Sequence, residues 1–282
     1  MPIQIMTDST ADLSPELIKR FSIHVIPLTV GFGGDVYRDG LDISAADLIG
    51  KIQNGPYFPK TTQPSPAEFL AKFRELLAGG DEVVYIGLSS QISGTFTSAR
   101  LALDELGDAP VSIVDSLNLS MGVGLLALHA AELVQTGKGR PEIVHAIETM
   151  VPKVKTAFIV DTLDFLYKGG RLSVVGAFVG NILNIHPMIQ MADGRLQMAE
   201  KIRGRRERAL ERMLEWAVSD PERIDPRWIS VTHVCCPRDA EYLAAEIRRL
   251  LPSAQEVVVT EAGAVIASHC GPGTIGILYV RR

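Results

Sequence analysis

Short apolar, β-branched runs alternate with longer amphipathic segments through the first half of the chain. Residues 3–6, 83–87 and 111–114 are such runs, and each is followed by polar residues and then by a helical pattern. Parallel strands need helical crossovers, so this repeated order is typical of a parallel sheet covered by helices. The pattern predicts an α/β chain whose residues 1–154 form a Rossmann-like domain with a doubly wound, mainly parallel sheet. A small hairpin insertion is predicted near residues 30–40.

The pattern changes after residue 154. A strand is predicted at 156–160, and strands at 185–191 and 195–202 flank Asp193-Gly194, which is typical of a two-residue hairpin turn. Further strands, with helices between them, are predicted at 228–233, 256–260 and 274–280. Antiparallel pairing beside helices predicts a second, α+β domain over residues 155–282, with its helices packed on one face of a mixed sheet.

Polar side chains follow several predicted strands. Thr7–Thr10 come after the first strand, Thr61–Gln63 form a predicted loop before a capped helix, and Ser93–Thr95 lie where the strand ending at Gly87 passes into a helix. Free backbone N–H groups and the dipole at a helix start attract anions, and ligands of open parallel sheets lie at the carboxyl edge. These stretches predict a small anion-binding site, and a capped turn needs the same residue types.

Composition narrows the class of protein. The 282 residues carry 28 Lys+Arg and 33 Asp+Glu, a net charge of −5, which gives no indication of a nucleic-acid partner. The cysteines are Cys235, Cys236 and Cys270, an odd number with two of them adjacent, which favours a reducing compartment over a disulfide framework. The start of the chain lacks the pattern of a signal peptide, and the apolar segment 121–134 is too short to span a bilayer. We expect a soluble, cytoplasmic protein.

Most motifs of catalysis and cofactor binding are missing. No G-x-S-x-G elbow or nucleotide-binding glycine motif occurs, and the adjacent cysteines lack the spacing that chelates zinc, so we expect no metal and no cofactor. His269 comes just before the rigid turn Gly271–Gly273, where it can be held at the edge of a site. An esterase or thioesterase that uses Ser93 and His269 remains the alternative function.

Basic residues gather around one predicted helix start, with one further arginine in a Gly-Gly loop. They are Lys201, Arg203, Arg205, Arg206 and Arg208, together with Arg171. Such a cluster is either a solvated helix face or a docking surface for an acidic or phosphate-bearing partner, because guanidinium groups bind phosphate through paired hydrogen bonds.

Six stretches in this order resemble the DegV family, the fatty-acid-binding subunits of the bacterial fatty acid kinase system. They are TDST at 7–10, KTTQPSP at 60–66, SSQISGTFTSA at 89–99, DSLNLSMGVG at 115–124, FLYKGGRLS at 165–173 and SHCGPGTIG at 268–276. The resemblance implies two domains with a long-chain fatty acid in a tunnel between them. The residues that match the family's carboxylate site are Thr61, Thr62, Ser93, Gly94 and His269.

The resemblance also implies a carrier without catalytic activity of its own. A separate ATP-dependent fatty acid kinase would phosphorylate the presented carboxylate, and the acyl phosphate would feed phospholipid synthesis. Arg171 and Arg203 match the family's basic residues that engage the kinase. We also include transient contact with a membrane surface among the predicted interactions.

The sequence departs from the family pattern at two positions, and it does not decide which segment forms the tunnel wall. Thr62 stands where serine is common and keeps the hydroxyl, whereas His186 stands where a lysine often precedes proline and loses a fixed charge. Val174–Leu183, rich in small and apolar residues, is the candidate helix for the tunnel wall, and ordinary helix packing would use the same residues.

Overall fold

The structure is a computed structural model, which describes residues 2–171 and 185–282. Its first half contains a four-stranded parallel sheet in the order β2-β1-β6-β7. The strands are β1 (Ile3–Asp8), β2 (His24–Ile26), β6 (Glu82–Gly87) and β7 (Val111–Asp115). The predicted α/β class with a parallel sheet in this half is confirmed.

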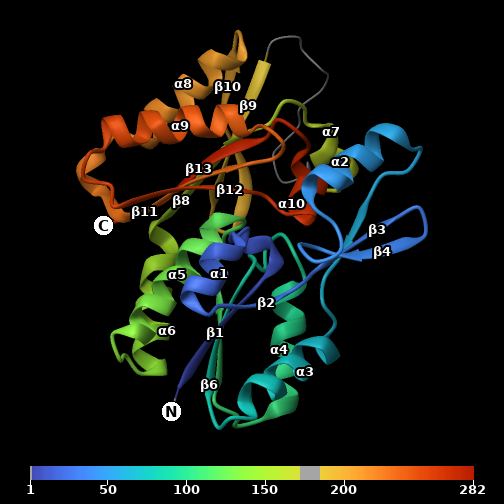
Figure 1. Cartoon of the computed structure of the whole chain (residues 1–282), viewed down its shortest axis with the longest axis vertical. Coiled ribbons are helices and arrows are strands. Elements are labelled where there is room, and N and C mark those ends of the chain that lie inside the picture. Colours follow the sequence, from blue (N-terminus) through green and yellow to red (C-terminus); the bar gives the residue numbers. More distant parts are fainter. Residues whose placement is uncertain (1, 172–184) are drawn as a thin grey trace.

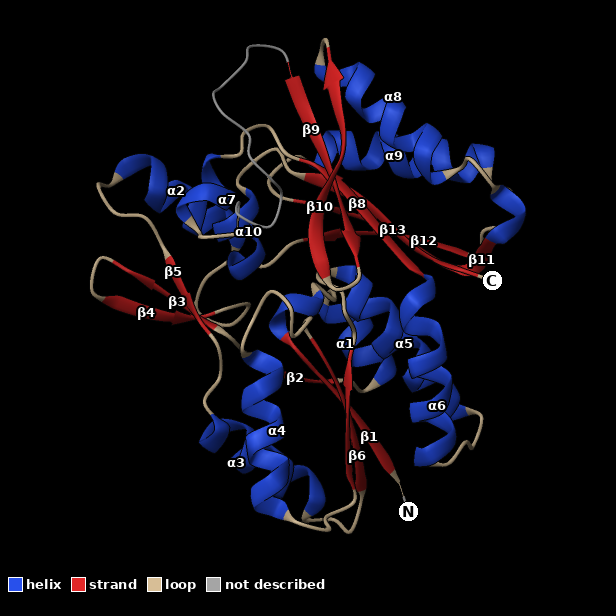
Figure 2. Ribbon diagram, turned by 180° about the vertical axis from the view of Figure 1, so that it is seen from behind, coloured by secondary structure: helices blue, strands red, loops and turns tan. Residues whose placement is uncertain are grey.

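Helices cover both faces of this sheet (Figure 2). One face carries α1 (Pro15–Phe21), α5 (Met121–Gln135) and α6 (Arg140–Met150), and the other carries α3 (Pro66–Leu77) and α4 (Thr95–Leu106). Alternate residues of one strand serve the two faces, because successive side chains of a strand point in opposite directions. Val84 and Ile86 pack with α5, whereas Val83 and Tyr85 pack with α3 and α4.

The second half contains a six-stranded mixed sheet in the order β10-β9-β8-β13-β11-β12. The strands are β8 (Val154–Ile159), β9 (Ile185–Ala192), β10 (Arg195–Arg203), β11 (Ile224–His233), β12 (Glu256–Glu261) and β13 (Ile275–Arg281). The β11–β12 pair is parallel and the other pairs are antiparallel. Helices α8 (Arg206–Ala217) and α9 (Pro237–Leu250) cover one face, as predicted (Figure 1).

A small antiparallel sheet of β3 (Thr29–Phe32), β4 (Asp35–Arg38) and β5 (Lys60–Thr62) projects from the first half. The predicted hairpin is β3–β4. The loop predicted over Thr61–Gln63 is wrong for Thr61 and Thr62, which belong to β5 and pair with Val30 and Thr29. This pairing is between residues far apart in the sequence, so the local residue pattern does not show it.

Short helices fill the space between the small sheet and the two larger sheets (Figure 1). They are α2 (Ala45–Asn54), α7 (Asp164–Lys168) and α10 (Ala264–Cys270). Elsewhere in the described residues, 3-10 turns lie at Ser9–Ala11, Val151–Lys153 and Pro221–Arg223. Capping boxes at Ser44 and Ser65 begin α2 and α3. Within the described residues, no helix combines the length and hydropathy that a membrane span requires.

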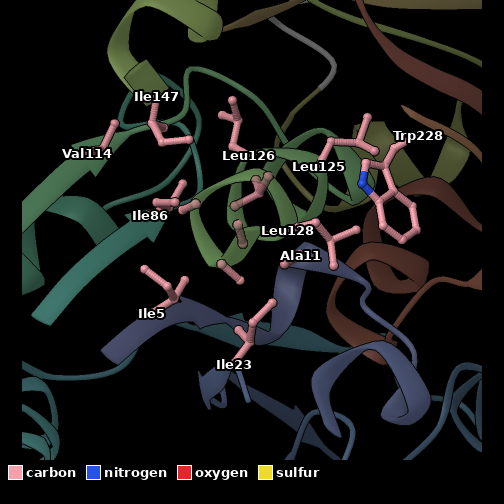
Figure 3. Close-up of a cluster of buried hydrophobic side chains, with 14 of the residues drawn as sticks. Ile5, Ala11, Ile23, Ile86, Val114, Leu125, Leu126, Leu128, Ile147 and Trp228 are labelled. Carbon is pink, nitrogen blue, oxygen red and sulfur yellow. The ribbon is translucent and has the colours of Figure 1, made fainter. Parts of the chain in front are cut away.

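The two larger sheets share a hydrophobic core through α5. The face of the second sheet that α8 and α9 leave uncovered contributes Trp228 and Leu278 to the cluster around Leu125 and Leu128 (Figure 3). Trp228 also meets the ring of Phe21 edge-on, with centroids 5.7 Å apart. The predicted domain boundary at residues 154 and 155 falls at the start of β8, and the division into two domains stays a prediction.

Candidate functional site

A cavity of about 60 Å³ lies at the carboxyl ends of β1 and β6. The chain leaves these adjacent strands toward opposite edges of the sheet, to β2 and to β7, and such a switch point is where an open α/β sheet forms a ligand crevice. The described residues around the cavity are Thr10, Leu28, Thr61, Leu88, Ile92, Ser93, Leu119, Leu166, Arg171, Leu196, Val265, Ile266, His269 and Cys270. The predicted candidates Thr61, Ser93, His269 and Arg171 therefore come together at one cavity.

The polar wall of this cavity comes from several separate elements. Thr61 of β5 and His269 of α10 are joined by a 3.0 Å contact between Oγ1 and Nε2. Ser93, just before α4, accepts a hydrogen bond from the Thr95 amide at 3.2 Å, and its hydroxyl lies 2.9 Å from the Thr95 hydroxyl. Thr10, at the tip of β1, donates its hydroxyl to the buried Asp8 carboxylate. These contacts fix the orientation of the hydroxyl groups around the cavity.

Arg171 contributes the positive charge of the wall. Its guanidinium donates to the Gly169 carbonyl at 2.8 Å, and of the described residues that line the cavity it is the one with a fixed positive charge. Burial, with Arg171 as a secondary cause, lowers the pKa of His269 to about 4. The imidazole is therefore neutral at pH 7, and the positive charge of the site belongs to the guanidinium.

The tautomer of His269 determines whether the Thr61 hydroxyl donates its hydrogen bond to the imidazole or is free to donate into the cavity. Nδ1 of His269 is buried without a hydrogen-bond partner among the described residues, close to Gly169, where an added Cβ would lie 2.3 Å from that nitrogen. We assign the proton to Nε2, because this avoids burying an unpaired N–H. Nε2 then donates to Thr61, and the Thr61 hydroxyl is free to donate into the cavity. Hydroxyl donors beside a guanidinium form a receptor for a carboxylate.

Acidification is expected to destabilise the fold through His269. The folded pKa of about 4 lies below the unfolded value of 6.5, so the unfolded chain binds this proton first as the pH falls from 6.5 to 4. At 1.36 kcal/mol per pKa unit, the loss reaches about 3 kcal/mol. The free energy of unfolding, measured by urea titration, should fall between pH 7 and pH 4 by about 3 kcal/mol less in His269→Gln than in the original protein. Parallel stability curves would contradict the neutral imidazole.

Asp39 serves as a control, because its titration should change the stability in the opposite direction to that of His269 as the pH falls. Burial raises the pKa of Asp39 to about 6, so the folded carboxyl takes up its proton at a higher pH than the unfolded one. Its contribution to stability therefore grows as the pH falls from about 6 toward 4. We expect Asp39→Asn to change the pH profile in the direction opposite to His269→Gln.

Two predicted residues of the carboxylate site do not line the cavity. Thr62 is exposed, because it follows Thr61 in β5 and successive side chains of a strand point to opposite sides. Gly94 is the residue before α4, and a Cβ there would lie 2.3 Å from Gln63. The Gln63 amide donates to Ser98 at 3.0 Å, so glycine permits this close contact beside the helix start. The resemblance implies direct carboxylate contact by both residues, whereas the exposure of Thr62 leads us to expect none from its side chain.

The predicted docking residues lie in different surroundings. Arg203 is exposed at the end of β10, whose other end at Arg195 contacts Gln91 at 2.9 Å, beside the loop that carries Ser93. At the usual rise of a strand, Arg203 lies about 25 Å from that contact. Arg171, in contrast, is half-buried in the cavity wall. The candidate wall helix Val174–Leu183 lies outside the described residues.

A second, inner cavity of about 30 Å³ lies next to the first one. Leu119, Ile266 and Cys270 line both cavities, so the two spaces lie on either side of these side chains. The inner cavity reaches the uncovered face of the second sheet. Sequence reasoning assigned no cavity to this inner region, because its walls come from five stretches that are spread over residues 119–278.

The hydroxyl groups around the inner cavity are bonded to other protein groups. Ser120 donates to Asp12 at 2.6 Å, Thr156 to Asn118 at 2.7 Å, and Thr274 to the Cys270 carbonyl at 2.9 Å. These bonds use the polar atoms, so the surface left facing the cavity is mainly apolar. The two cavities together offer polar donors at one end and an apolar space at the other.

The geometry of the described residues does not join Ser93 to His269 directly. Ser93 has its hydrogen bonds with Thr95, and the Nε2 atom of His269 faces Thr61. An esterase would need its nucleophile within hydrogen-bond reach of the base. Among the described residues, no group of three or more His, Cys, Asp or Glu side chains is placed to hold a metal ion.

Comparisons with known proteins agree with this architecture. The family model described as "Uncharacterised protein, DegV family" matches residues 2–282. A DegV domain-containing protein of Deinococcus radiodurans is 36% identical over 98% of both chains. The solved structure of a fatty-acid-binding DegV family protein from Thermus thermophilus has a TM-score of 0.93 and 35% identity, with full coverage of both chains. DegV of Bacillus subtilis, described as a fatty acid binding protein, has a TM-score of 0.90 and 33% identity, again with full coverage of both chains. The chain belongs to the DegV family.

Proposed function

We propose that this chain binds one long-chain fatty acid, with the carboxylate at Thr61, Ser93 and Arg171. The observation that carries the proposal is the pair of neighbouring cavities, with hydroxyl and guanidinium donors around the outer one and mainly apolar surface around the inner one. An amphipathic ligand with an anionic head matches both ends. The solved relatives from Thermus thermophilus and Bacillus subtilis, described as fatty acid binding, support the same ligand class.

The tail supplies most of the affinity in this proposal. Each buried methylene contributes about 0.8 kcal/mol, so a dozen contribute about 10 kcal/mol before the cost of ordering the chain. The space between the described side chains is smaller than such a tail, so the neighbouring side chains must move apart as it enters. The hydroxyl and guanidinium groups then fix the orientation and keep the carboxylate at the outer end.

The proposal extends to a carrier role without catalysis. A separate ATP-dependent fatty acid kinase would phosphorylate the presented carboxylate, and the acyl phosphate would serve phospholipid synthesis. Arg171 lies at the outer cavity and Arg203 on an exposed strand end, where both can meet an acidic partner surface. Because a kinase that uses ATP works in the cytoplasm, the carrier would also be cytoplasmic. It would contact the membrane surface transiently when it takes up or releases the fatty acid.

Organic extraction of the purified protein, followed by mass spectrometry, tests the binding function. We expect close to one free fatty acid per chain and no turnover of acyl esters. Ester hydrolysis that disappears in Ser93→Ala would support the esterase instead. Protein without lipid, and without affinity for added palmitate after delipidation, would contradict the proposal.

A further inference from the structure

The floor of the inner cavity is formed by three neighbouring strands of the second sheet. Phe158 of β8, Gly276 of β13 and Thr232 of β11 lie directly opposite one another in the sheet register. All three line the cavity, with Gly276 in the middle of the row. Because Gly276 has no side chain between two residues that have one, the sheet surface is recessed at this point.

The backbone at Gly276 does not itself demand glycine. Gly276 is not among the glycines with positive φ, so an L-residue can adopt its strand conformation. A Cβ added there would lie 3.0 Å from the Ala157 carbonyl oxygen and 3.0 Å from the Phe158 Cβ, so the neighbouring strand β8 would have to shift to accept it. Glycine inside a strand marks a place where a neighbouring backbone or a ligand approaches closely, and Gly276 both lies against β8 and leaves the cavity above the sheet open.

The recess lies at the far end of the proposed path of the ligand. Helix α10 runs alongside both cavities. His269 lines the outer cavity, Ile266 lines both, and Ala262, just before the helix, lines the inner one. A tail that begins at the carboxylate site therefore runs along α10 and meets the sheet at Gly276.

The sheet behind Gly276 offers no further room. The flanking residues Ile275 and Ile277 point to the opposite face, where they are fully buried with α8 and α9. The neighbouring Thr232 hydroxyl is bonded to Thr260 at 2.9 Å. The floor is thus a hydrogen-bonded, close-packed layer, and additional methylene groups must displace side chains beside the recess.

We infer that Gly276 sets the longest acyl chain that this protein accepts, because the methyl end of the fatty acid occupies the recess above it. Gly276 is then a specificity-determining residue of the ligand site. This inference rests on the proposed fatty acid binding and adds the position of the tail's end.

Competition between saturated acids of different length tests this inference. Delipidated protein is mixed with equimolar laurate, myristate, palmitate and stearate, and the bound acids are extracted and quantified. Gly276→Ala should lower the affinity for the longest acid bound by the original protein about fourfold relative to the acid two carbons shorter, since the added methyl group removes room for about one methylene. Phe158→Leu, which enlarges the same recess, should shift the preference toward longer acids.

Gly50→Ala is the matched control for the glycine replacement. Gly50 lies in α2, lines neither cavity, and has no heavy atom within 4 Å of an added Cβ, so this variant should keep the original length preference. Unchanged preference in both Gly276→Ala and Phe158→Leu, with normal binding, would overturn the role of Gly276. Original protein that binds none of the acids would instead overturn the proposed function.

If Gly276→Ala does not fold, Phe158→Leu decides the question. A shift of its bound acids toward longer chains supports the inference, and an unchanged distribution contradicts it.

Discussion

Replacing Thr61 and Ser93 together with alanine is expected to lower the affinity for palmitate about a thousandfold. Each hydroxyl faces the outer cavity and can donate to a carboxylate. A hydrogen bond to a charged group contributes about 1.5 to 3 kcal/mol, so two of them account for about 4 kcal/mol. Displacement of a fluorescent fatty acid by palmitate gives the dissociation constants of the delipidated original protein and of the delipidated double variant. The double variant should fold normally, because both side chains are small and half-buried.

Thr62→Ala is the matched control for this experiment. Thr62 is adjacent to Thr61 in β5 and has the same side chain, but it is exposed on the other side of the strand. We expect this variant to bind palmitate as the original protein does. An unchanged affinity in the double variant, or an equal loss in Thr62→Ala, would show that the carboxylate lies elsewhere.

Arg171→Glu is expected to weaken fatty acid binding by more than a hundredfold. The resemblance to the DegV family implies a partner-docking role for Arg171, whereas in the structure this residue lines the outer cavity. The substitution replaces the fixed positive charge of this wall with a negative charge that repels the ligand's carboxylate, in a half-buried position where such interactions are poorly screened. Arg171→Gln, which removes the charge without reversing it, should have a smaller effect.

The pKa of His269 provides a second measurement of the effect of Arg171→Glu. Arg171 is one of the causes that lower this pKa, so NMR titration of the imidazole in Arg171→Glu should show it raised. Arg203→Glu is the control, because Arg203 is exposed at the end of β10, and it should change neither binding nor the imidazole. Normal binding by Arg171→Glu would leave this residue with a docking role alone.

The sequence predicts those parts of the fold that depend on neighbouring residues. The runs that became β1, β6 and β7 are short and apolar, and polar residues follow each of them, so both the parallel sheet and its polar edge could be recognised. The capped helix predicted after Gln63 likewise begins where its capping residues lie, at Ser65 and Glu68. Local hydrogen bonding and hydrophobic alternation carry this information.

Features that depend on distant residues could not be predicted in the same way. Thr61 and His269 are 208 positions apart, and their contact exists because β5 pairs with β3 while α10 packs beside the small sheet. The recess at Gly276 depends on the register of three strands. In the sequence, this glycine is one small residue inside an apolar run. In the folded sheet, Phe158 and Thr232 lie on either side of it and make it the bottom of the recess.

A crystal structure of the protein with bound palmitate tests the central claim most directly. We expect continuous, elongated density that begins within hydrogen-bond distance of Thr61, Ser93 and Arg171, passes between Leu119 and Ile266, and ends above Gly276. A fatty acid bound in the reverse orientation, or at another surface while both cavities stay closed, would contradict this account.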